Sequence, residues 1–193
     1  VGVNLALLLM ATGLRALDLP DAARGLLPAT AIEWTTVGWS TPLLAGHLPL
    51  WSIVTLQVAI VIVVVDFVEY WRHRLHHRSA LLWRLHRVHH NDPLLDATTA
   101  GRIHPVESVV ATLLTVIVLI AAGVPIWIEV LRATLVNPVV FAQHANVRFS
   151  PLLERLAARW IATPEWHRVH HSRDVADQNC TFGQLLSIWD RIF

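Results

Sequence analysis

The stretch WSIVTLQVAIVIVVV, residues 51–65, runs without a charged residue into DFVEYWRHRLHH, residues 66–77. An α-helix rises about 1.5 Å per residue, so about 20 apolar residues cross the roughly 30 Å hydrocarbon layer of a bilayer. The apolar region from Leu48 to Tyr70 is long enough, and its first charge is Asp66. We therefore predict a transmembrane helix that leaves the bilayer at a histidine-rich segment.

The composition also indicates a membrane protein. Hydrophobic residues make up 54% of the 193 residues, charged residues only 15%, and the mean hydropathy is +0.50. All 15 basic residues are Arg and the net charge is +1, which excludes a broad cationic surface for nucleic acid. The single cysteine, Cys180, excludes a disulfide framework or a multi-cysteine metal site. The twelve histidines are the only abundant metal-binding side chains of borderline softness.

A second apolar block runs from Val106 to about Ala145. It is interrupted by Gly123 and Pro125, a pattern typical of two helices joined by a tight turn. Glu129 and Arg132 lie three residues apart in the second arm. Because each charge costs about 3 kcal/mol at mid-bilayer, we expect them to pair or to lie near the far interface.

The N-terminal part is also apolar. The first 14 residues lack the charged start and the cleavage site of a signal peptide, so we interpret them as part of a membrane helix. The region from Leu26 to His47 is interrupted by Pro and Gly, which favours an interfacial or re-entrant segment. We predict an all-α integral membrane protein with three to four transmembrane helices and a single domain over residues 1–193, truncated at both ends.

A helical hairpin returns the chain to the side that it left, so residues 72–104 and 148–193 are expected on one face of the membrane. Six arginines lie in each region, and the positive-inside rule predicts that this face is cytoplasmic. Ten of the twelve histidines lie in the same two regions, and His144 ends the hairpin. We therefore predict a cytoplasmic helical cap that carries the histidines. The Arg-only, Ala-rich composition suggests a bacterial inner membrane.

Three motifs share one histidine spacing: HRLHH at 73–77, and HRVHH at 86–90 and 167–171. Helix positions i, i+3 and i+4 lie on one face, so each motif presents two or three imidazoles to a common point. One zinc ion needs only three or four protein ligands, so eight or more histidines favour two metal ions. A solvated histidine-rich loop is the alternative, but such loops do not repeat this spacing on separate segments.

Asp66, Glu69, His73 and His77 form one continuous stripe on a helix. The carboxylates could hold the second nitrogen of a ligating histidine and fix its tautomer, or form a solvated charge pair at the helix end. Two further histidines are candidates, namely His104 in RIHPVE and His144 in AQHANV. His47 and His76 are expected to be ordinary polar residues, and Cys180 an unreactive small one.

Other catalytic motifs are missing from the sequence. It contains no HExxH, GxSxG, Walker A loop or GxGxxG. It also lacks the Glu-x-x-His of soluble carboxylate-bridged di-iron proteins. Among the catalytic sites considered, the sequence supports only an all-histidine site for two metal ions.

The sequence resembles the membrane-bound fatty acid hydroxylase and sterol desaturase superfamily over most of residues 66–193. The motifs that carry the resemblance are DFVEYWRHRLHH (66–77), LWRLHRVHHND (82–92), RIHPVE (102–107), FAQHANV (141–147), PEWHRVHHS (164–172) and FGQLLSIWDRIF (182–193). The metal ligands that it implies are His73, His77, His86, His89, His90, His167, His170 and His171. His104 and His144 match further histidine positions of the family, as ligands or as groups behind them.

Asn146 and Asn179 are weaker candidates for groups behind the ligands. The sequence departs from the family pattern at Thr181, where Asn is common, and it ends before the usual Gly-Thr that follows the final Phe. The first departure bears on substrate fit and the second supports truncation. Neither one touches a histidine motif.

The resemblance implies a non-haem centre of two iron ions that uses O2 and electrons from an external donor of the cytochrome, ferredoxin or rubredoxin type. The reaction would hydroxylate or desaturate a C–H bond of a lipid such as a sterol or a fatty acyl chain, and we favour hydroxylation. Zinc could substitute in purified protein, but it has no redox chemistry. The sequence leaves two alternatives open, a zinc-dependent membrane hydrolase and a non-catalytic metal-binding or metal-transporting membrane protein.

Overall fold

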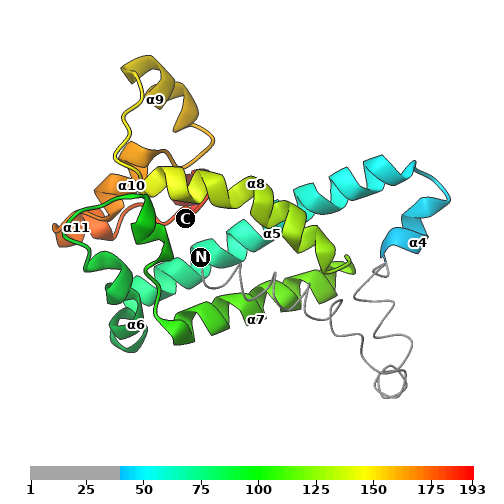
Figure 1. Cartoon of the computed structure of the whole chain (residues 1–193), viewed down its shortest axis with the longest axis horizontal. Coiled ribbons are helices and arrows are strands. Elements are labelled where there is room, and N and C mark those ends of the chain that lie inside the picture. Colours follow the sequence, from blue (N-terminus) through cyan, green and yellow to red (C-terminus); the bar gives the residue numbers. More distant parts are fainter. Residues whose placement is uncertain (1–39) are drawn as a thin grey trace. The chain divides into compact units, whose positions relative to one another are not determined.

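The computed structural model describes residues 40–193, and helices joined by loops make up this range, as predicted (Figure 1). The predictions for the first 14 residues and for most of Leu26–His47 lie outside the described residues. The helices are α4 (Ser40–Ala45), α5 (Leu50–Arg78), α6 (Ala80–His90), η1 (Ala97–Gly101), α7 (Pro105–Ala122), α8 (Trp127–His144), α9 (Pro151–Ala157), α10 (Pro164–His170), α11 (Val175–Gln178) and α12 (Trp189–Ile192). No strand occurs among residues 40–193, where Ile161 and Leu186 form an isolated bridge.

Two of the described helices, α5 and α7, are long and apolar enough to cross a membrane. The helix predicted from Leu48 to Tyr70 is α5, which continues through the first histidine motif to Arg78. Helix α8 does not meet the same test, and it contains Glu129, Arg132 and Pro138. The number of transmembrane helices, three to four, therefore stays a prediction.

The predicted hairpin is confirmed, because α7 and α8 are joined by a short turn. Gly123 ends α7 with a φ of 63°, a left-handed conformation that residues with a Cβ adopt at a cost. Its N–H donates to Ile120 and the N–H of Val124 donates to Leu119, so carbonyls of the last turn are satisfied. The predicted ion pair is also present, with Arg132 Nε 2.6 Å from a Glu129 carboxylate oxygen.

The described residues fall into two compact units. One comprises residues 40–64 and Thr112–Thr134, and the other comprises Val65–Ala111 and Leu135–Phe193. All three histidine motifs lie in the second unit. The single domain over 1–193 stays a prediction.

The carboxylate of Asp66 joins the two ends of the second unit. It accepts hydrogen bonds from the backbone N–H groups of Leu185 and Leu186 at 2.8 and 3.0 Å, and from Trp189 Nε1 at 2.8 Å. An aromatic cluster of Phe67, Tyr70, Trp71, Trp189 and Phe193 packs beside it. The C-terminal segment is thereby fastened to α5, directly before the first histidine motif.

Candidate metal centre

All three histidine motifs lie at the C-terminal ends of helices, and two of these helices start at a capping residue. The first motif ends α5, and Ser79 then caps α6, its Oγ accepting from the Leu82 N–H. Thr163 caps α10, its Oγ1 accepting from the Trp166 N–H at 3.2 Å, and Pro164 follows as the first helical residue. The capped N-terminal ends of α6 and α10 therefore fix where each helix starts and where its histidines lie.

The structure gathers nine of the ten predicted ligands into two groups. One group contains His73, His77, His86, His90 and His170, and the other contains His89, His144, His167 and His171. Within each group the candidate ligand nitrogens lie within 4.8 Å of one another. Two nitrogens on one ion at about 2.1 Å each are at most about 4.2 Å apart, so each group is close to the size of a metal site.

The two H-x2-H-H motifs are divided between the groups in the same way. In each, the histidines at i and i+4 enter one group and the histidine at i+3 enters the other. His86 and His90 join the first group while His89 joins the second, and His167 and His171 join the second group while His170 joins the first. Positions i and i+4 are only about 40° apart around a helix, whereas i+3 and i+4 are about 100° apart. Each such motif can therefore serve two ions.

The first group exposes unpaired nitrogens to its own interior. The Nε2 atoms of His73, His77, His86, His90 and His170 are all buried and have no hydrogen-bond partner within the described part of the chain. Buried polar atoms normally have a hydrogen-bond partner, so five unpaired nitrogens close together indicate that they share a partner. A cation that accepts imidazole lone pairs is such a partner.

The second group shows the same requirement in another form. The Nδ1 atoms of His89 and His144 each lie near a backbone carbonyl, that of Thr99 at 3.1 Å and that of Val140 at 2.8 Å. A carbonyl only accepts, so both Nδ1 atoms carry the proton and both Nε2 atoms carry a lone pair. These two Nε2 atoms nevertheless face each other at 3.2 Å. Two lone pairs repel at this distance, and a cation between them removes the conflict.

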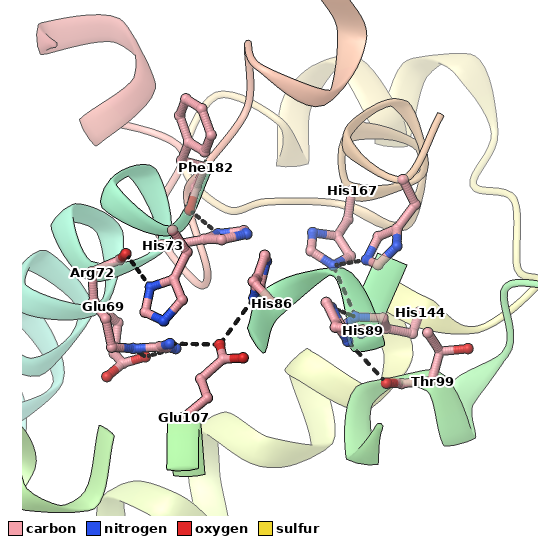
Figure 2. A network of polar contacts seen from close by, with 12 residues as sticks. Glu69, Arg72, His73, His86, His89, Thr99, Glu107, His144, His167 and Phe182 are labelled. Atoms are coloured by element: carbon pink, nitrogen blue, oxygen red, sulfur yellow. Dashed lines mark hydrogen bonds and ion pairs between the residues drawn. The ribbon is translucent and has the colours of Figure 1, made fainter. Parts of the chain in front are cut away.

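Two more ligand candidates have their Nδ1 atom held by an acceptor. His73 Nδ1 donates to the Phe182 carbonyl at 3.0 Å, and His86 Nδ1 donates to a carboxylate oxygen of Glu107 at 2.9 Å (Figure 2). Such partners fix the tautomer and the ring orientation, leaving Nε2 for the ion. The donor set is imidazole throughout, which suits iron, zinc, copper and nickel.

Glu107 is a residue that the sequence analysis missed. The same oxygen that accepts from His86 also accepts from Arg72 at 2.7 Å, and Arg72 in turn donates to Glu69 at 2.6 and 2.9 Å (Figure 2). A chain of charges therefore runs from α5 through Glu107 on α7 to His86. The only available signal was the position of this glutamate in RIHPVE, three residues after the candidate His104.

The two carboxylates of the predicted stripe have different partners from those expected. Asp66 accepts from the C-terminal segment, and Glu69 reaches His86 only through Arg72 and Glu107. The reason is geometric, since an arginine one turn away and free backbone N–H groups compete for these oxygens.

The remaining candidates lie outside both groups. His104 Nδ1 accepts from the Val106 N–H at 3.2 Å, Asn146 is exposed, and Asn179 donates to the Val175 carbonyl at 2.7 Å. Their roles at the metals stay predictions. His76, expected to be an ordinary polar residue, is buried with Nδ1 2.6 Å from the Arg72 carbonyl.

Burial keeps the imidazoles neutral, as metal ligation requires. Loss of solvent lowers the pKa of His89 to about 3 and that of His90 to about 2. Burial also lowers the pKa values of His86, His167, His170 and His171. At neutral pH these groups are uncharged and offer their lone pairs.

A cavity of about 60 Å³ adjoins the histidines. Members of both groups line it, together with Glu107, Arg72 and Gln143. A water molecule occupies about 30 Å³ in the liquid, so the cavity has room for small molecules beside both groups.

Comparison with known proteins agrees with these features. The sequence model of the family described as fatty acid hydroxylase matches residues 58–193. Among curated proteins, the chain is 31% identical over 156 residues to ornithine lipid hydroxylase OlsE of Rhizobium tropici, covering 78% of the chain and 46% of that protein. It is 30% identical over 138 residues to alkylglycerol monooxygenase of Xenopus tropicalis, covering 67% of the chain and 28% of that protein.

The alkylglycerol monooxygenase of Danio rerio is 31% identical over 139 residues, with the same coverage as the Xenopus protein. The chain therefore spans less than half the length of the curated relatives that it matches. No solved structure matches it.

Proposed function

Since the chain belongs to the fatty acid hydroxylase family, we propose that it is a di-iron oxygenase that uses O2 and externally supplied electrons to hydroxylate a C–H bond of a lipid. The observation that carries the proposal is the pair of all-histidine groups. The size of each group, the orphaned nitrogens of the first and the opposed lone pairs of the second fit one metal ion each. The relatives, which are named as lipid hydroxylase and monooxygenases, favour oxygenation over hydrolysis or metal transport and favour hydroxylation over desaturation.

In this proposal one ion is held by His73, His77, His86, His90 and His170, and the other by His89, His144, His167 and His171. Iron at these positions would supply the electron transfer that O2 reduction requires, whereas zinc could occupy the same ligands without redox chemistry. The surrounding chain holds the ligands ready. Four of them donate Nδ1–H to fixed acceptors, and two of the others, His167 and His170, are buried.

The substrate and the partners belong to the same proposal. The two apolar helices α5 and α7 support a lipid substrate that stays in the bilayer while its C–H bond meets the metals. The arginine distribution supports an active site on the cytoplasmic face of a bacterial inner membrane. There an electron donor of the cytochrome, ferredoxin or rubredoxin type has access.

The first test is the iron and zinc content per chain of detergent-purified protein from iron-supplemented cells. We expect two metal ions per chain, at least partly iron. The double variant His86→Ala/His170→Ala removes two ligands of the five-histidine group only, so it should keep one ion. His144→Ala/His167→Ala should do the same for the other group. The exposed His47, changed to Ala, is the control and should keep both ions.

Activity is then measured as transfer of isotopic oxygen from O2 into lipid, with a chemical reductant present. A single zinc ion that survives iron feeding, with turnover in the absence of O2, would support the hydrolase instead. Absence of stoichiometric metal in the wild type would exclude every metal-dependent function considered above.

A further inference from the structure

Helix α9, with the residues on either side of it, forms an exposed surface of apolar and basic side chains. Its large apolar residues are open to solvent, with Leu152 65%, Leu153 50%, Leu156 48% and Trp160 71% exposed. Arg148, Arg155 and Arg159 are exposed on the same short segment. Residues 148–161 are called the α9 segment below.

The charged side chains that the α9 segment exposes are basic. Its only carboxylate is that of Glu154, which is turned inward and accepts a hydrogen bond from the Thr163 hydroxyl. Glu154 forms no ion pair with the three exposed arginines among the described residues. Leu and Trp together with Arg are the residues that favour the boundary between lipid headgroups and acyl chains, the indole at headgroup level and the arginines on anionic headgroups.

The α9 segment is firmly connected to the candidate metal centre. The Thr163 hydroxyl that donates to Glu154 also caps α10, which carries His167 and His170. The Ala158 carbonyl accepts from Ser187 Oγ at 2.8 Å and from Arg191 at 2.7 Å. Figure 1 shows α9 projecting beyond α10 and α11 at the edge of this unit, and its leucines are exposed.

We propose that the α9 segment docks on the surface of an anionic lipid bilayer, with its leucines and Trp160 among the acyl chains and its arginines on the headgroups. A firm connection to α10 means that this docking holds the third histidine motif beside the lipid. The inference concerns the membrane contact alone, so it stands even if the chemistry proposed for the metals is wrong. An acidic protein partner is the competing occupant, and the test below distinguishes the two; we favour the bilayer because Trp and Leu beside Arg are typical of the headgroup boundary.

The test places a fluorescent label on the α9 segment of the full chain in lipid nanodiscs. Cys180, the only cysteine, is first changed to Ser, and Leu152→Cys is then labelled with an environment-sensitive dye. The matched control is Val175→Cys on α11, which is 70% exposed and flanked by Asp174 and Asp177. We expect nitroxide lipids to quench the label at 152. We expect aqueous iodide to quench the label at 152 several-fold less than the label at 175.

The basic residues are tested by the charge reversal Arg155→Glu, with Arg173→Glu as the control on another exposed loop. Arg155→Glu should increase iodide quenching at 152 in anionic nanodiscs and change little in zwitterionic ones, whereas Arg173→Glu should have no effect. Equal iodide access at 152 and 175 in anionic nanodiscs would overturn the proposal, and would leave an acidic protein as the occupant. If Leu152→Cys does not fold, Leu156→Cys gives the same comparison.

Discussion

At the scale of single residues, the positions of the candidate ligands were predictable but their orientation was not. Helical spacing is local, so HRVHH alone places three imidazoles on neighbouring parts of a helix face. The acceptors behind the rings come from distant segments. Phe182 holds His73 across 109 residues, and Glu107 holds His86 across 21. No local pattern encodes such a contact, because it depends on how the helices pack.

Removing Glu107 tests whether the acceptor behind a ligand matters. In Glu107→Ala, His86 Nδ1 loses its acceptor and Arg72 loses one of its two carboxylates. We expect the five-histidine group to lose about 10–100-fold in metal affinity, while the four-histidine group keeps its ion. Competition with a chelator, followed by metal analysis, measures this change.

The control for that variant is Glu129→Ala. Like Glu107, Glu129 is a buried carboxylate paired with an arginine, in its case Arg132. No histidine contacts Glu129 in the described structure. Glu129→Ala should destabilise the fold without selective loss of one ion. Equal metal loss in both variants would mean that Glu107 acts only through folding.

At the scale of helices, the short α10 depends on the residue that caps its start, Thr163. It has only seven residues, and both H-x2-H-H motifs divide their histidines between the two groups, so disorder of α10 would affect both ions. The sequence TPEWHRVHH shows the cap and the proline that follows it. It could not show that Thr163 also donates to Glu154 on α9.

We predict that Thr163→Ala destabilises the protein by about 1 kcal/mol and weakens the binding of both ions, because a lost N-cap frays the helix that presents His167 and His170. Thr163→Ser, which keeps the hydroxyl, should restore most of both properties. Thermal unfolding and metal retention are measured in parallel. Ser150→Ala removes the cap of α9 instead. A similar loss of metal in Ser150→Ala would show that general destabilisation, not the cap of α10, is responsible.

At the scale of the whole molecule, the candidate site lies in one compact unit, and the family match covers all of that unit. Periodicity and apolar runs predicted the long helix α5 and the helical hairpin, because these follow from local hydrophobicity. The fastening of residues 182–193 to Asp66 could not be predicted, since it joins segments about 120 residues apart. That connection holds residues 182–193 against α5, where the Phe182 carbonyl contacts the buried His73.

A large number of neutral, buried imidazoles predicts how the metal-free protein responds to acid. An unfolded histidine takes up a proton near pH 6.5, but folded His89 does so only near pH 3. Between these values the unfolded state binds more protons, so acidification favours unfolding, by up to about 1.4 kcal/mol per pH unit for each such group. Stability should be full above about pH 6.5 and fall as the pH is lowered.

We therefore expect the melting temperature of chelator-treated protein in detergent to fall steeply between about pH 7 and about pH 5. His89→Gln removes one of these titrating groups and should make the dependence shallower, whereas His47→Ala, which changes an exposed histidine, should leave the slope unchanged. Bound metal should delay the fall, because protons must first displace the ion from its ligands. A melting temperature independent of pH over this range would mean that the imidazoles are solvated in the metal-free protein, and that the buried histidine groups form only when metal binds.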